Sequence, residues 1–436
     1  MVVRGGRVVD PSQGLDAVTD LLVRDGRVAA IGNDLPHPPG AEVLDARGMI
    51  VAPGLIDAHV HLRDPGFPEK ETLGTGAASA LRGGFTAVCC MPNTRPALDT
   101  PEAIADVVAR SRGLGVRVHP IGAISVGRQG ERLADLDAMA AAGAIGFSDD
   151  GDSTRSSAVM RRALSWSADN GRPIMVHCED WTLAPSGVMN EGAVSRDLGV
   201  VGIPAAAEEI ITGRDIELAR LTGGWLHVLH VSTARSLELV RLGKRAGAHV
   251  TAEVMPHHLL LTDAWVAGQR RFVGEAEVVP GSCPDPNARV NPPLRPESDA
   301  VALLGGLRDG TFDIIATDHA PHAASDKPAD LSRAASGMLG LEFALPLLLK
   351  LVDSGRLPLS LMIDRLSTAP ARMLGLPGGT LRPGSAADVV VIDPSAEWEV
   401  TPEVIASRSK NTPLLGLTLR GLVRATIIGG EVRYRA

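Results

Sequence analysis

Aromatic residues and cysteines are scarce in this chain of 436 residues. Aromatic side chains make up 3% of it, with a single tyrosine, so its core must be built from Ala, Val, Leu and Ile, which suit close-packed α/β layers. The four cysteines show no CxxC spacing, and Cys89 and Cys90 are neighbours, which argues against a disulfide framework. This usage predicts a protein of the reducing cytoplasm.

Strong charge and long apolar runs are also missing. The formal net charge is −8 and no long run of one sign occurs, so nothing indicates a nucleic-acid or membrane-surface partner. The most apolar stretch, LEFALPLLLKLV, is short and is interrupted by Glu342, Pro346 and Lys350. The N-terminal residues MVVRGGRVVD lack the apolar core of a signal peptide. We therefore expect a soluble protein that acts on a small molecule.

The two ends of the chain share one pattern. In TDLLVRDGRVAAIG, the pair Asp25-Gly26 separates two apolar-rich runs as a hairpin turn does, and Gly429-Gly430 does the same in ATIIGGEVRYR. Because the chain exceeds the roughly 250 to 300 residues at which one core stops growing, a second, smaller domain is expected. The sequence predicts that both ends pair into one small sheet domain.

The middle of the chain alternates short β-branched runs with segments of helical period, which is typical of α/β proteins. Either a (β/α)8 barrel or a doubly wound sheet would explain this alternation. Most of the runs end in His, Asp or Asn, and barrel enzymes gather their chemistry at the carboxyl ends of several strands, so we favour the barrel. The eight runs are GLIDAHVHL, FTAVCCMPN, VRVHPIGAIS, AIGFSDD, PIMVHCED, WLHVLHVS, HVTAEVMPHH and FDIIATDHAPH.

Histidines and aspartates at the strand ends suggest a metal site. His59 and His61 are two residues apart in a strand and point to the same side. An H-x-H pair alone is a modest signal, but further histidines and aspartates close four other runs, and together they form the donor set that catalytic Zn²⁺ takes. The candidate ligands are His59, His61, Asp150, His177, His230 and Asp318.

The remaining histidines are expected elsewhere. His227 lies an odd number of residues from His230 and should face the helix layer, and His319 should point out of the barrel. We interpret the others as structural or supporting: His37, His119, His249, His257 and His258.

Several motifs together resemble the amidohydrolase superfamily, and specifically the longer, bacterial type of dihydroorotase. They are GLIDAHVHLRDPG, GGFTAVCCMPNTRP, FSDDG, MVHCED, HVLHVSTARS, TAEVMPHHLLLT, VNPPLR and IATDHAPH, in order between about residues 45 and 435. The resemblance implies a (β/α)8 TIM barrel over 53–375 and a small β-sandwich built from 1–52 and 376–436. It also implies reversible cyclisation of N-carbamoyl-L-aspartate to L-dihydroorotate in de novo pyrimidine (UMP) biosynthesis.

The resemblance assigns roles to single residues. His59, His61 and Asp318 match ligands of a first zinc ion, Asp150 a bridging ligand, and His177 and His230 ligands of a second; whether one or two ions bind stays open. It implies that Asp318 is also the catalytic base and acid. The residues that it implies for substrate binding are Arg63, Asn93 and His322 around a carboxylate, and Asn291, Ser336 and Gly337 around the ring.

Three features of the sequence depart from the family pattern. Many relatives bridge their metals with a carboxylated lysine, but none of the five lysines ends the fourth strand, where FSDDG offers Asp150, or on the other face Asp149. Ser336 replaces an aromatic residue found in many relatives. The Pro-rich loop at 274–290, which carries Cys283, is longer than usual and is interpreted as a surface insertion with an accessible thiol.

Two alternative functions remain. The first is another cyclic amidase, such as a dihydropyrimidinase, hydantoinase or allantoinase. The second is a noncatalytic or conditionally active subunit that scaffolds aspartate carbamoyltransferase, as in some relatives. Loss of the histidine ligands would mark the second, and here all are present. The resemblance implies a homo-oligomer that can associate with the transcarbamoylase.

Overall fold

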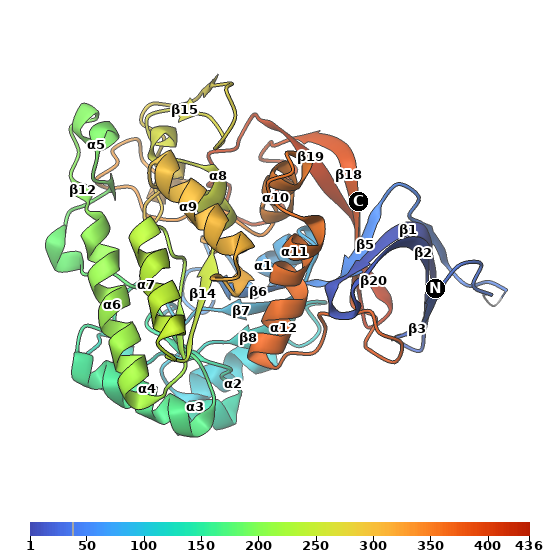
Figure 1. Ribbon diagram of the computed structural model, residues 1–436, viewed down its shortest axis with the longest axis horizontal. Helices are drawn as coiled ribbons and strands as arrows, with labels where there is room; N and C mark the ends of the chain where they lie inside the picture. The colour runs from blue at the N-terminus through green and yellow to red at the C-terminus, as the bar shows by residue number, and fades with distance from the viewer. Residues whose placement is uncertain (37–38) are drawn as a thin grey trace.

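Parallel strands and helices alternate through the middle of the chain in the computed structural model, which describes residues 1–36 and 39–436 (Figure 1). His37, which we expected to be structural, lies outside the described residues. Each of the eight predicted runs contains a strand, which confirms the α/β class. These strands are β6 (Leu55–Val60), β7 (Phe85–Cys90), β8 (Arg117–Pro120), β9 (Phe147–Ser148), β10 (Ile174–Val176), β13 (Leu226–Val228), β14 (Val250–Val254) and β17 (Ile314–Ile315).

The eight strands form two parallel sheets. One has the order β6-β7-β8 and the other β17-β14-β13-β10-β9. Two isolated parallel bridges join them, Gly122 to Phe147 at one junction and Val60 to His319 at the other. Because all eight strands run parallel, their carboxyl ends lie on one side, where the predicted site residues follow them.

Helices follow most of these strands and cover them. Side-chain caps start several of them: Thr72, Thr100, Asp135, Ser156 and Thr233 each accept a hydrogen bond from the backbone N–H three residues on. The helices are α1 (Leu73–Arg82), α2 (Pro101–Arg110), α3 (Leu136–Ala142), α4 (Ser157–Asn170), α6 (Ala205–Thr222), α7 (Ala234–Arg245), α9 (Glu297–Arg308), α10 (Ala344–Asp353), α11 (Leu359–Ile363) and α12 (Ala369–Leu374).

Strands from both ends of the chain share one sheet, as predicted, and both termini lie beside it (Figure 1). Its order is β20-β19-β18-β5-β1-β2-β3, with β4 beside β1, and β18 joins β5 antiparallel. The sheet has its own buried cluster, which includes Val8, Leu21 and Val391. Its strands are β1 (Val2–Asp10), β2 (Leu15–Arg24), β3 (Arg27–Gly32), β4 (Val43–Asp45), β5 (Ile50–Pro53), β18 (Val389–Glu399), β19 (Thr418–Ile428) and β20 (Glu431–Arg435).

Both predicted hairpin turns are confirmed. Asp25 and Gly26 connect β2 to β3 with φ of 51° and 73°, the left-handed values that a two-residue hairpin turn requires. A Cβ on Gly26 would lie 2.9 Å from the carbonyl oxygen of Gly429, in the turn between β19 and β20. The two turns therefore pack against each other, which favours glycine at both.

The segment predicted as a loop at 274–290 is partly ordered into a short hairpin. Its strand β16 (Val279–Pro280) pairs antiparallel with β15 (Gln269–Arg270), and Cys283 beyond it is exposed, as expected. Short elements outside the parallel sheets are β11 (Met189–Asn190), α5 (Ala193–Asp197), β12 (Gly202–Ile203) and α8 (Pro256–Leu260). Within residues 1–36 and 39–436, every helix is too short or too polar to span a bilayer.

Candidate metal centre and active site

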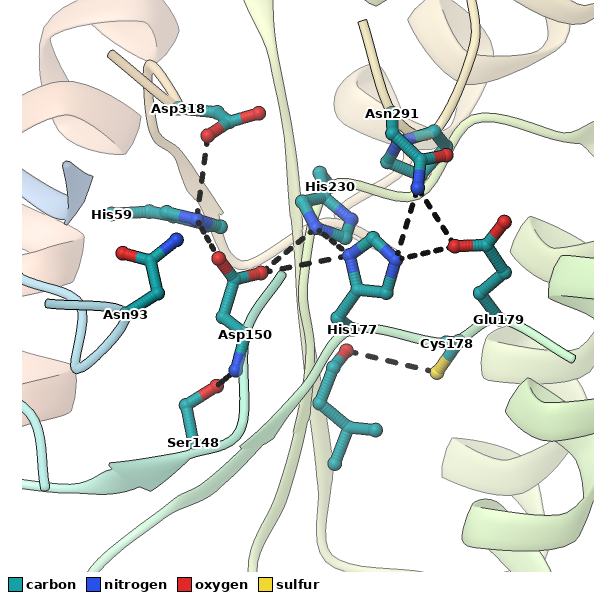
Figure 2. A network of polar contacts seen from close by, with 12 residues as sticks. His59, Asn93, Ser148, Asp150, His177, Cys178, Glu179, His230, Asn291 and Asp318 are labelled. Atoms are coloured by element: carbon teal, nitrogen blue, oxygen red, sulfur yellow. Dashed lines mark hydrogen bonds and ion pairs between the residues drawn. The ribbon is translucent and has the colours of Figure 1, made fainter. Parts of the chain in front are cut away.

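The ends of four parallel strands bring five of the predicted ligands together. Figure 2 labels all of them except His61. They form two groups, one of His59, His61 and Asp150 and one of Asp150, His177 and His230. Within each group the candidate ligand atoms lie within 4.8 Å of one another, and all five residues are buried. Asp150 belongs to both groups.

Asp150 turns one oxygen toward each group. Its Oδ2 lies 3.5 Å from His59 Nε2 and 3.3 Å from His61 Nε2, whereas its Oδ1 lies 3.2 Å from His230 Nε2 and 3.6 Å from His177 Nδ1. Asp149 faces elsewhere and accepts hydrogen bonds from Ser125 N, Ser125 Oγ and Thr154 Oγ1. The structure thus places Asp150, rather than Asp149, between the two groups.

Asp318 borders the first group. Its Oδ1 lies 2.9 Å from His61 Nε2 and 3.5 Å from His59 Nε2. Burial alone would raise the pKa of Asp318, but the hydrogen bond with His61 and the neighbouring histidine charges lower it below its ordinary value. Asp318 is therefore an ionised carboxylate at the edge of the cluster, able to accept a proton.

Three histidines are anchored through the ring nitrogen that points away from the cluster. His59 Nδ1 lies 2.7 Å from Glu253 Oε1, His61 Nδ1 lies 2.8 Å from Asn93 Oδ1, and His177 Nε2 lies 3.0 Å from Glu179 Oε2. Since oxygens of this kind accept hydrogen bonds, each anchored nitrogen carries a proton, and the ring nitrogen that faces the cluster is the one that can bind a metal ion. This is the tautomer that a metal ligand needs.

The anchoring carboxylates Glu179 and Glu253 were not predicted. Burial would raise the pKa of each, yet the neighbouring histidines lower both pKa values to about 2. Glu253 stands inside the apolar run of β14, so a charged residue in a buried strand was the available signal. Glu179, two residues after His177 in MVHCED, carried no distinguishing signal of its own.

The cluster fits a divalent metal. His59 Nε2 is buried and has no hydrogen-bond partner, although it points toward Asp150 and Asp318. A buried ring nitrogen without a partner costs free energy, which a metal ion would relieve. Imidazole nitrogens and carboxylate oxygens in two adjoining groups form the donor set of a metal hydrolase.

The predicted substrate residues line a cavity of about 260 Å³ over the cluster. Arg63 is 9% exposed, and burial lowers its pKa to about 10. Its Nε donates to Pro321 O at 3.2 Å, while its Nη2 lies 3.3 Å from His322 Nε2. The cavity is lined by His61, Arg63, Asn93, Asp150, Gly151, His177, His230, Asn291, Asp318, Ala320, His322, Ser336 and Gly337.

The terminal N–H groups of Arg63 have no acceptor among the described residues. His322 Nε2 lies 2.9 Å from Ser336 O, which only accepts, so this ring nitrogen is itself an N–H and cannot accept from Arg63. Asp64, the next residue in the sequence, pairs with Arg110. Among the described residues, both terminal nitrogens of Arg63 therefore lack an acceptor and are available to a ligand.

The residues predicted to contact a substrate ring already have some hydrogen-bond partners. Asn291 Nδ2 donates to Glu179 Oε2 at 2.7 Å. Gly337 N donates to Arg289 O at 2.9 Å, and Gly337 O accepts from Asn411 Nδ2 at 3.1 Å. Gly337 therefore shapes the cavity wall, and its backbone groups already have partners.

The prediction for His227 was wrong. His227 is buried, with Nε2 3.2 Å from Glu253 Oε2 and Nδ1 2.8 Å from Thr251 Oγ1, so it lies beneath the cluster and not against the helices. Counting from His230 failed because strand β13 ends at Val228 and His230 has a φ of 31°. This left-handed residue reverses the alternation and turns its own ring toward Asp150.

The other histidines lie outside the two groups, as expected. His319 Nδ1 accepts from the backbone N–H groups of Gly340 and Leu341. His258 donates to Pro292 O and packs against His257, with ring centroids 4.4 Å apart. The two remaining predictions concern His249, which stacks on Trp225, and His119, which is half-buried on β8.

Comparisons with known proteins agree with this geometry. A dihydro-orotase-like family model matches residues 48–236, and a model of the amidohydrolase family matches residues 237–434. A dihydroorotase from Geobacter metallireducens is 45% identical over 436 residues, covering 100% of this chain and 99% of the relative. The chain belongs to the dihydroorotase family of amidohydrolases. A dihydroorotase from Anaeromyxobacter dehalogenans is 47% identical over 433 residues, covering 99% and 97% of the two chains.

Solved structures with a similar fold include hydantoinases, which are also named dihydropyrimidinases. An L-hydantoinase (dihydropyrimidinase) from Arthrobacter aurescens superimposes with a TM-score of 0.86 at 26% identity, covering 100% of this chain and 96% of its own. A D-hydantoinase (dihydropyrimidinase) from Thermus sp. has a TM-score of 0.82 at 24% identity, covering 100% and 95%, and shows the fold alone. The family match and the dihydroorotase relatives show that the chain is a cyclic amide hydrolase. Its His and Asp side chains are grouped as a metal site requires.

Proposed function

We propose that the eight parallel strands close into a (β/α)8 barrel over residues 53–375. The two bridges that join the parallel sheets support closure, because they connect β6 with the end of β17 and β8 with β9. Residues 1–52 and 376–436 would form the β-sandwich, supported by their shared sheet and its own buried cluster.

We propose that the chain interconverts N-carbamoyl-L-aspartate and L-dihydroorotate. The observation that carries this proposal is the cavity, which combines a two-group His/Asp cluster with a guanidinium whose terminal nitrogens lack an acceptor. L-dihydroorotate combines the two matching features, a cyclic amide to be cleaved and a carboxylate. Arg63 and Asn93 would hold that carboxylate, since a guanidinium fork matches its planar geometry. His322 would share its Nε2–H between the carboxylate and Ser336 O.

The metal that suits this cluster is Zn²⁺. His59, His61 and Asp318 would hold one ion, His177 and His230 a second, with Asp150 between them. Zinc supplies such a site with a water of lowered pKa and with polarisation of a carbonyl oxygen. No lysine is among the residues that line the described cavity, which supports Asp150 as the bridge.

Asp318 is the residue placed to move the proton. In the hydrolytic direction its carboxylate would accept a proton from the attacking water and pass it to the ring nitrogen as the C–N bond breaks. Asn291 and the wall at Ser336 and Gly337 would position the ring so that its carbonyl faces the cluster. In the reverse direction Asp318 would take the proton from the carbamoyl nitrogen as that nitrogen attacks the carboxyl carbon, and would pass the proton to the oxygen that leaves as water.

A dihydropyrimidinase or hydantoinase is the second candidate, because the Arthrobacter structure is so similar. The substrate carboxylate distinguishes the two functions, because dihydroorotate has one and dihydrouracil and hydantoin do not. Turnover of L-dihydroorotate, dihydrouracil and hydantoin should be compared at equal zinc content. A strong preference for dihydroorotate is expected, and equal or faster turnover of dihydrouracil would overturn the proposal.

A dependence on aspartate carbamoyltransferase is tested separately. We propose that the chain, as a homo-oligomer, cyclises carbamoyl aspartate without the transcarbamoylase. The two candidate metal groups and the cavity are assembled within one chain, which supports activity without that partner. Rates with and without added transcarbamoylase should therefore agree. A rate that rises from zero only with the partner would assign the conditionally active role instead.

A further inference from the structure

We propose that Glu253 is a positioning residue that holds both metal groups in register through one buried carboxylate. The inference rests on the proposed metal centre and goes beyond its ligands. Glu253 lies in β14, which contributes no predicted ligand, and it is 0% exposed. A charge buried so completely needs several partners.

One oxygen of Glu253 contacts a histidine from each group. Glu253 Oε1 lies 2.7 Å from His59 Nδ1, and it also accepts a hydrogen bond from the backbone N–H of His230 at 3.3 Å. His59 belongs to the first group and His230 to the second. A single atom therefore fixes the distance between two ligands that lie far apart in the sequence.

The contact at His230 also stabilises unusual backbone. His230 has a φ of 31°, a left-handed conformation that costs a non-glycine residue about 1 kcal/mol or more. The next residue, Val231, is also bound to Glu253, because its backbone N–H donates to the backbone oxygen of Glu253 at 3.2 Å. Glu253 thus binds the turn that aims the His230 ring at Asp150.

The second carboxylate oxygen of Glu253 is bound by His227, which is not a candidate ligand. Glu253 Oε2 lies 3.2 Å from His227 Nε2, His227 Nδ1 lies 2.8 Å from Thr251 Oγ1, and Trp225 Nε1 donates to that hydroxyl at 2.8 Å. Because His227 donates from Nε2, its Nδ1 accepts from Thr251. This chain explains why an imidazole is buried beneath the cluster without being a candidate ligand.

The arrangement has a defined effect on metal binding. With Nδ1 donating to Glu253, His59 keeps its Nε2 lone pair directed at the first group, and the carboxylate makes that nitrogen more basic. Loss of such a partner typically weakens metal affinity by about 10- to 100-fold. Since Glu253 touches both groups, both affinities should fall.

The experiment compares Glu253→Gln and Glu253→Ala with wild type and with Glu342→Gln. Glu342 is a matched control, a buried glutamate that pairs with Arg82 away from the cavity. Zinc affinity is measured on the metal-free full-length proteins by competition with a chromophoric chelator, and unfolding temperatures of the same metal-free proteins are recorded.

The expected result is about 10-fold weaker zinc binding for Glu253→Gln, which keeps one acceptor oxygen, and about 100-fold for Glu253→Ala. Glu342→Gln should bind zinc as tightly as wild type does. In the two Glu253 variants, the KM for dihydroorotate should change little once zinc is saturating. His227→Gln should show a smaller loss than Glu253→Ala.

Wild-type affinity in Glu253→Gln and Glu253→Ala would overturn the inference. So would a loss in Glu253→Gln matched by Glu342→Gln, since it would reflect removal of any buried charge. Failure of wild type itself to bind zinc would instead refute the proposed metal centre, so the two failures are distinguishable.

Discussion

Replacing Arg63 tests the proposed recognition of a carboxylate most directly. Arg63 lines the cavity, and its Nε donates to Pro321 O while both terminal nitrogens lack an acceptor among the described residues. A carboxylate bound by that fork gains two charge-assisted hydrogen bonds, each contributing about 1.5 to 3 kcal/mol. Losing both costs about 3 to 6 kcal/mol, or about 10² to 10⁴ in kcat/KM.

The assay follows dihydroorotate hydrolysis by Arg63→Met and Arg63→Lys with zinc content matched to wild type. Arg63→Met should lose the full factor, while Arg63→Lys, which keeps the charge but not the fork, should lose about half of the free energy. Any slow turnover of dihydrouracil, which has no carboxylate, should be nearly unchanged. Arg117→Lys, at the Asp388 ion pair, serves as the control.

Equal losses on dihydroorotate and dihydrouracil would refute the reasoning, because the arginine would then act on the site as a whole. So would wild-type kcat/KM for dihydroorotate in Arg63→Met.

Three further predictions follow from single residues. Asp318→Asn should bind zinc and lose about 10² to 10⁴ in kcat; full activity with bound zinc would contradict its proton-transfer role. Cys283 should be the one thiol that reacts rapidly with a chromogenic disulfide, because the other three cysteines are buried; a second fast thiol in native protein would contradict this. Burial raises the pKa of Asp215 to about 6, although Arg214 opposes the rise, so the folded state binds more protons than the unfolded state between about pH 4 and 6. The stability from this group is complete below about pH 4 and is lost as the pH rises through 6, a change of about 3 kcal/mol for 2.2 pKa units. In denaturant unfolding, Asp215→Asn should therefore gain stability relative to wild type from pH 4 to pH 7, and a constant difference would show that the shift is absent.

Local sequence pattern was sufficient for much of the fold. The eight β-branched runs all contain strands, and the turns at Asp25-Gly26 and Gly429-Gly430 occur where glycine at positive φ is required. These features depend on neighbouring residues, so periodicity and turn chemistry reveal them. The clustering of His59, His61 and His177 was predictable for a related reason, since parallel strands end on the same side.

The backbone conformation at the strand ends could not be predicted from residue spacing. Arg63, His230 and Asp318 all have positive φ, at 58°, 31° and 47°. Strict alternation assumes extended backbone, so it misplaced His227, whose position was counted from His230. Non-glycine residues adopt this conformation only where surrounding contacts hold them, and those contacts come from other strands.

By itself the sequence determined the α/β alternation, the sheet shared by the two ends and the identity of the donor groups, because each depends on residue type and local spacing. The tertiary structure alone decided that Glu253 meets His59, across 194 positions, and that Arg63 lines the cavity while its terminal nitrogens have no acceptor among the described residues. Such contacts depend on how separate strands are aligned and where each one ends, which no local pattern encodes.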